Sequence, residues 1–118
     1  MVPALRRHAA YRVGVDADGI GPTGETVRVT MFVRGSVQGV GFRWWTRARA
    51  LELGLAGHAR NTADGRVEVV AQGSADAVEA LEALLRESPS TTRRPGHVES
   101  VVTQPGVPRD GITGFVER

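Results

Sequence analysis

The most regular pattern in the chain is an alternation of apolar and mostly polar side chains that begins at residue 27. It covers eight positions: Val27, Arg28, Val29, Thr30, Met31, Phe32, Val33 and Arg34. Because successive side chains of a strand point to opposite faces, this pattern predicts a strand with one buried face. Shorter patterns predict further strands over residues 55–61, 66–72, 97–103 and 112–117.

Two other segments repeat their apolar side chains at the spacing of a helix. The first runs from Phe42 to about Leu53 and is ended by Gly54. The second follows Ser74, which can cap the first turn of a helix. Its buried stripe consists of Val78, Leu81, Leu84 and Leu85.

The connections between these elements complete the order of the fold. Residues 62–65 predict a hairpin turn, and residues 88–96 predict an exposed loop in which Arg93 and Arg94 are solvated. The chain therefore runs β-α-β-β-α-β, followed by a terminal strand. This order predicts an α+β fold of the ferredoxin-like, split β-α-β type, with two helices on one face of an antiparallel sheet.

The length and composition of the chain predict a single domain. A chain of 118 residues with 41% hydrophobic content can bury a core of its own. Residues 1–26 combine arginines and glycines without sustained periodicity. We therefore expect a disordered or loosely attached extension over residues 1–26 and a single domain over residues 27–118.

Composition also excludes several kinds of site. There is no cysteine, and His8, His58 and His97 make no ligand spacing, so we expect no disulfide, no metal site and no cofactor. No apolar stretch suits a membrane span or a signal peptide, which predicts a cytoplasmic protein that does not bind membranes. A net charge of +2 is too small to argue for nucleic acid.

The run from Arg34 to Arg43 is the strongest chemical feature of the sequence. Its glycines let neighbouring backbone N–H groups converge, and the helix start adds free N–H groups and the positive end of a dipole. Arg43 adds a fork of donors that matches phosphate oxygens. The run therefore predicts a phosphate-binding loop formed by Gly35, Ser36, Val37, Gln38, Gly39, Val40, Gly41, Phe42 and Arg43.

Asn61, at the end of the strand predicted over residues 55–61, is the second candidate. It shares a strand face with Ala59, the face expected toward the helices, and the fold could bring it near the glycine loop. An asparagine can orient a water molecule but cannot act as a general base. A site that binds anions strongly but has no general acid or base suits an acyl phosphate, because the carboxylate leaves without protonation. An alkyl phosphate would need an acid or a metal ion to assist its leaving group.

These two motifs make residues 27–118 resemble the acylphosphatases. The loop over residues 35–43 is similar to one signature of that family, and Gly57–Asn61 with Asp64–Gly65 is similar to a second. The ending over residues 114–118 also fits the terminal strand of the family. Ala59 departs from the usual valine, a change that affects packing more than chemistry.

The resemblance implies metal-independent hydrolysis of a small acyl phosphate to a carboxylate and inorganic phosphate. It implies that Arg43 and the loop amides bind the phosphoryl group and that Asn61 positions the attacking water. It also implies that an oxygen of the substrate's own phosphate accepts the proton of that water. We expect the protein to act as a monomer.

Other interpretations of the same residues compete with this one. Ser36 has no nearby His–Asp pair to make it a nucleophile, and His58 is expected to be exposed and aimed away from Asn61. Trp44 and Trp45 fit helix packing better than base stacking. The fold also serves non-catalytic modules that sense a metabolite or bind RNA. For RNA, the open sheet face offers many cations but a single aromatic side chain, in the set Arg28, Phe32, Arg34, His58, Arg60 and Arg66.

Overall fold

The computed structural model describes residues 25–118. The extension expected over residues 1–26 lies outside the described residues, apart from its last two, and Thr26 already belongs to the first strand. The elements within residues 25–118 are, in order, β1 (Thr26–Ser36), α3 (Phe42–Glu52), β2 (Ala56–Asn61), β3 (Val67–Ser74), α4 (Ala75–Arg86), β4 (His97–Gly106) and β5 (Phe115–Glu117).

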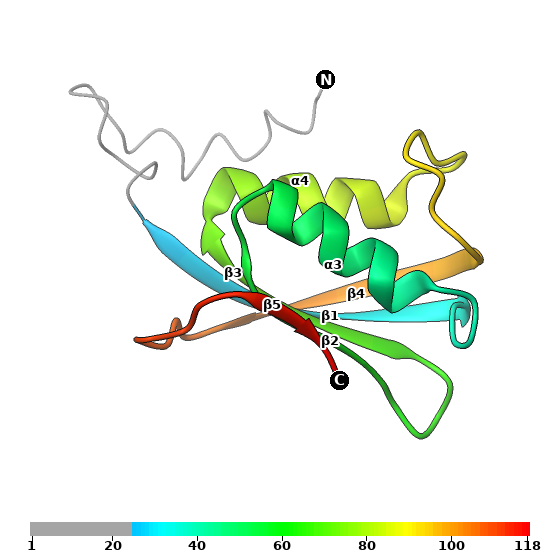
Figure 1. Ribbon diagram of the computed structural model, residues 1–118, viewed down its shortest axis with the longest axis horizontal. Helices are drawn as coiled ribbons and strands as arrows, with labels where there is room; N and C mark the ends of the chain where they lie inside the picture. The colour runs from blue at the N-terminus through cyan, green and yellow to red at the C-terminus, as the bar shows by residue number, and fades with distance from the viewer. Residues whose placement is uncertain (1–24) are drawn as a thin grey trace.

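The strands form one sheet in the order β4-β1-β3-β2-β5, and both helices cover the same face of it (Figure 1). The ferredoxin-like arrangement predicted from the sequence is therefore confirmed. No helix within residues 25–118 has the length and apolar character that crossing a membrane requires.

The sheet is mixed, whereas the sequence predicted an antiparallel one, because β5 pairs in parallel with β2. The register explains this difference. Gly106, the last residue of β4, lies opposite Arg28, which lies opposite Gln72, which in turn lies opposite Ala56 at the start of β2. Residues 107–114 cross that end of the sheet, so β5 starts beside the start of β2 and runs in the same direction.

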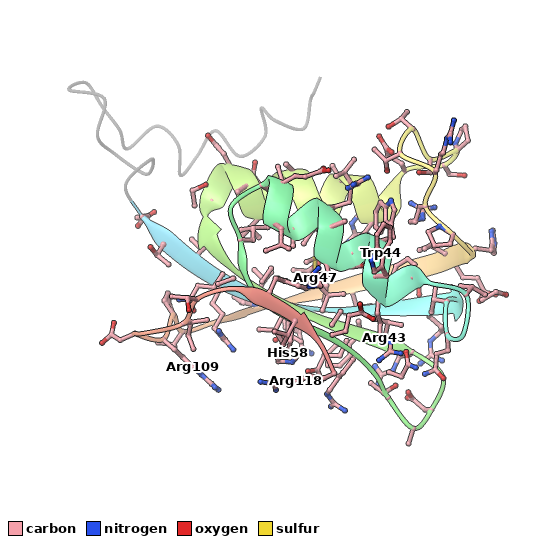
Figure 2. All side chains as sticks on the ribbon, in the orientation of Figure 1. Arg43, Trp44, Arg47, His58, Arg109 and Arg118 are labelled. Carbon is pink, nitrogen blue, oxygen red and sulfur yellow. The ribbon has the colours of Figure 1, made fainter. Side chains whose placement is uncertain are left out.

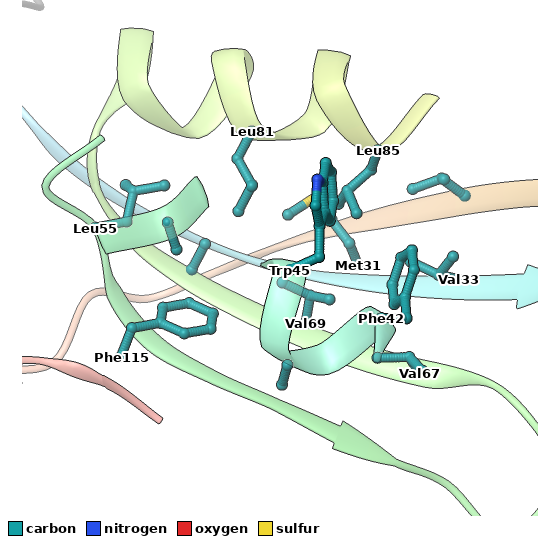
Figure 3. Close-up of a cluster of buried hydrophobic side chains, with 14 of the residues drawn as sticks. Met31, Val33, Phe42, Trp45, Leu55, Val67, Val69, Leu81, Leu85 and Phe115 are labelled. Atoms are coloured by element: carbon teal, nitrogen blue, oxygen red, sulfur yellow. The ribbon is translucent and has the colours of Figure 1, made fainter. Parts of the chain in front are cut away.

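The core lies between the sheet and the two helices (Figure 3). The alternation that predicted β1 is confirmed, since Met31 and Val33 are fully buried against the helices. Trp45 is buried in the core, while Trp44 is 62% exposed, as expected for packing within a helix. The buried cluster consists of Met31, Val33, Val37, Phe42, Trp45, Ala50, Leu55, Ala59, Val67, Val69, Ala71, Val78, Leu81, Leu85, Val101 and Phe115.

The sheet face away from the helices is less exposed than the sequence predicted. The side chain of His58 is only 13% accessible and lies 3.2 Å from Oε2 of Glu68. Val70 and Gln72 point to the same face and are also buried. Gln72 donates to the backbone oxygen of Arg109, which holds the segment after β4 against this face.

Helix α4 is capped at both ends. Ser74 accepts a hydrogen bond from the backbone N–H of Ala77, as predicted. The other cap corrects the prediction of a solvated arginine pair. Arg94 donates to the backbone oxygens of Leu84, Leu85 and Glu87 at 2.8–3.0 Å, so it satisfies carbonyls that the helix end leaves without partners.

We predict that Arg94→Ala destabilises the protein by about 1–3 kcal/mol, because it leaves several partly buried carbonyl groups without a hydrogen-bond donor. Chemical denaturation measures this loss. Arg93→Ala is the matched control, since Arg93 is exposed and the change removes the same charge. Equal effects of the two changes would contradict the capping role of Arg94.

Candidate active site

The loop between β1 and α3 begins with a bulge. The pairing of β1 with β4 shifts register between Arg34 and Gly35. Gly35 has a φ of 142°, and a Cβ atom built there would lie 2.1 Å from the backbone oxygen of His97. Gly35 and Ser36 still belong to β1 and pair with β4, so the free turn is shorter than the predicted loop and spans residues 37–41.

This turn presents backbone N–H groups that have no protein acceptor. Within residues 25–118, the N–H groups of residues 38–43 donate to no backbone or side-chain oxygen. Gly41 caps α3 with a φ of 91°, no side chain caps the helix, and its first turn carries no acidic residue. The positive end of the helix dipole is therefore uncompensated, which is the condition for binding an anion.

Gln38 ties the turn to the neighbouring hairpin. Its side-chain Nε2 donates to the backbone oxygens of Thr62 and Arg66, at 2.9 and 2.8 Å. Thr62 follows Asn61 directly, so these bonds fix the turn against the residues beside Asn61. Gln38 was predicted to belong to the phosphate-binding loop, but local patterns do not reveal this link, because it joins residues more than twenty positions apart.

Arg43 lies in the first turn of α3, at the mouth of this loop (Figure 2). Its Nη1 donates to the backbone oxygen of Arg118 at 2.5 Å, and among the described residues no Asp or Glu side chain pairs with it. One turn later, Arg47 Nε donates to the backbone oxygen of Phe115 at 3.0 Å. The main-chain oxygen of Arg118 thus positions Arg43, a contact that local sequence patterns do not predict.

Asn61 ends β2 on the face that the helices cover. It pairs with Val67 and lies on the same face as Ala59, which is fully buried in the core. Its Oδ1 is buried and has no hydrogen-bond partner among residues 25–118. Buried acceptors normally have a partner, so this oxygen is an unsatisfied acceptor at the end of β2.

The turn after Asn61 is held by charge. Asp64 accepts a hydrogen bond from the hydroxyl of Thr62 and lies 2.9 Å from Nε of Arg66. These two partners, the Thr62 hydroxyl first, lower the pKa of Asp64 to about 2. The ionised carboxylate of Asp64 therefore stabilises the hairpin turn to which Gln38 is also hydrogen-bonded.

Comparison with known proteins assigns the family. The acylphosphatase family model matches residues 29–116, most of the chain. The chain belongs to the acylphosphatase family. The acylphosphatase of Corynebacterium glutamicum strain R is 60% identical over 94 residues, which are 80% of this chain and 99% of that protein. The acylphosphatase of Thermobifida fusca gives the same identity and coverage.

Solved acylphosphatases share the fold. The structure of an acylphosphatase from Coxiella burnetii matches with a TM-score of 0.68 and 33% identity, over 79% of this chain and 93% of that one. The acylphosphatase from Bacillus subtilis gives a TM-score of 0.66 and 26% identity, over 78% and 98% of the two chains. The resemblance inferred from the two motifs is thus confirmed.

We predict that the Asp64 carboxyl titrates near pH 2 and that Thr62→Val raises its pKa toward the ordinary value of 3.8. Because the folded-state pKa is depressed, the carboxylate stabilises the turn above about pH 4 and this stabilisation is lost as the pH falls toward 2. Side-chain carboxyl NMR measures both pKa values. An unchanged value in Thr62→Val would show that the hydroxyl does not hold the charge.

Proposed function

We propose that this protein hydrolyses acyl phosphates to a carboxylate and inorganic phosphate without a metal ion. One observation carries the proposal: unpartnered backbone N–H groups and the guanidinium of Arg43 gather at the uncapped start of α3. Every donor in that set is neutral or cationic, so the set suits an oxyanion and not a metal ion. Within residues 25–118, no three His, Asp or Glu side chains gather as metal ligands.

In the proposed reaction the phosphoryl oxygens accept hydrogen bonds from the loop amides and from Arg43. The bond from phosphorus to the carboxylate oxygen breaks as the oxygen of a water molecule bonds to phosphorus. The carboxylate leaves with the bonding electron pair and needs no proton. The water's proton passes to a phosphoryl oxygen, because the carboxamide of Asn61 can orient the water but cannot take its proton.

The site offers Asn61 Oδ1 as the acceptor for one O–H of that water. Its lack of a protein partner supports this role, and Gln38 supports it by holding the adjacent Thr62 against the loop. The monomeric state, the cytoplasmic location and the absence of nucleic acid from its partners stay predictions.

The rival function is a regulatory module that binds a metabolite without turnover. The deciding experiment is an assay of the full chain on benzoyl phosphate, with and without a chelator. We expect hydrolysis of similar rate in both conditions. Absence of turnover would favour the regulatory module, and loss of turnover with the chelator would overturn metal independence.

We predict that Arg43→Ala weakens the binding of inorganic phosphate by about 1.5–3 kcal/mol for each charge-assisted bond lost, and lowers turnover further. Arg43→Lys should restore little, because a point charge cannot reproduce the guanidinium fork. Arg47→Ala is the matched control, since it also removes a bond from α3 to the main chain of residues 115–118. If Arg47→Ala lowers phosphate affinity equally, Arg43 acts by holding β5 and not by binding phosphate.

We predict that Asn61→Ala lowers kcat by about a hundredfold or more while the inhibition constant of inorganic phosphate changes little. The melting temperature should not fall much, because the change removes a buried oxygen that has no protein partner. Equal losses of turnover and phosphate affinity would argue that Asn61 binds the phosphate and does not position the water.

A further inference from the structure

The sheet face opposite the helices holds a hollow of about 790 Å³, which we name the basic basin. Its charged lining residues are Arg28, His58, Arg60, Glu68, Arg109 and Arg118. Figure 2 shows His58, Arg109 and Arg118 on the side of the sheet away from α3 and α4. The proposed reaction uses none of these side chains.

The basin has more positive charge than it can neutralise. Glu68 is the single acidic side chain in its lining and is paired with Arg60 at 2.9 Å and with His58 at 3.2 Å. Among the described residues, no Asp or Glu side chain pairs with Arg28, Arg109 or Arg118. Four guanidinium groups against one side-chain carboxylate give the side chains of the basin a net charge of +3 when His58 is neutral.

Two of these arginines are positioned by one buried carboxamide. Gln72 Oε1 accepts hydrogen bonds from Arg28 Nη1 at 3.1 Å and from the backbone N–H of Arg109 at 3.0 Å. Gln72 Nε2 donates to the backbone oxygen of Arg109 at 2.8 Å. Burial, and then the charge of Arg109, lower the pKa of Arg28. The protein therefore holds two like charges near each other, an arrangement that a bound anion would stabilise.

The spacing of the arginines favours an extended anion. Arg28 lies on β1, while Arg118 follows β5 at the far edge of the sheet. The backbones of β1 and β2 are two strand spacings apart, roughly 10 Å, so the arginines are spread across the sheet, and their excess positive charge matches an anion with more than one phosphate group. Guanidinium groups match phosphate oxygens as a fork. We propose that the basic basin binds a small molecule that carries several phosphate groups in a row.

A single-stranded nucleic acid fits this face less well. Such ligands stack bases on aromatic side chains, and Phe32 is the one aromatic residue that lines the basin. The guanidinium of Arg66 already lies over its ring, 4.5 Å from the ring centroid. The phosphate groups are thus the part of a ligand that the basin can recognise.

The test is calorimetric titration of the full-length protein with inorganic tripolyphosphate and, separately, with a nucleoside triphosphate. Both should bind to the wild type and to Arg43→Ala, because the side chain of Arg43 does not line the basin. The double variant Arg28→Gln, Arg109→Gln should weaken binding by about tenfold or more. Arg34→Gln is the matched control, since Arg34 is exposed on β1 outside the basin, and it should change affinity by about twofold at most.

Three outcomes would overturn the proposal: loss of tripolyphosphate binding in Arg43→Ala, unchanged affinity in the double variant, or tighter binding of a single-stranded oligonucleotide than of tripolyphosphate. Amide NMR of the wild type decides the matter if the double variant does not fold. The shifts should cluster around residues 28, 58–60 and 104–109, and shifts confined to residues 35–43 would also overturn it. Activity on benzoyl phosphate is measured separately, so this proposal and the proposed function fail independently.

Discussion

The two hydrogen bonds from Gln38 are the contacts on which the candidate site depends. They join the turn before α3, which carries the anion donors of the proposed reaction, to the hairpin that directly follows Asn61, the residue proposed to position the water. The turn before α3 contains Gly39 and Gly41, and the composition of neither segment fixes its position relative to the other. A fixed spatial relation between them therefore requires a bond across the gap, and Gln38 makes two.

Few acidic side chains lie around this link. The start of α3 has no acidic residue and no side-chain cap, so its dipole is directed at the turn without compensation. Arg43 donates to the main-chain oxygen of Arg118, and among the described residues no Asp or Glu side chain pairs with it. Unpaired N–H groups at a helix start favour a nearby negative charge, and a bound oxyanion would supply it.

Local patterns in the sequence were sufficient for the order of the elements, the buried face of β1 and the Ser74 cap, because each depends on residues close together in the chain. They also selected Arg43 and Asn61 as candidates.

Contacts between distant residues could not be predicted in this way. Arg94 looked like a solvated loop residue because nothing in its neighbourhood reveals the end of α4. His58 looked exposed because its cover comes from other strands and from the segment after β4. The direction of β5 depends on where β4 stops, which no periodicity indicates.

The close approach of Gly35 to His97 has a consequence for how variants of this protein are judged. There is no room for even one methyl group between the two backbones. A side chain at position 35 would push β4 outward from the sheet and shift the turn that follows β1. Such a variant would look catalytically dead in an assay although every chemical group of the site is intact. Its defect would lie in the pairing of β1 with β4 and not in the chemical groups of the site.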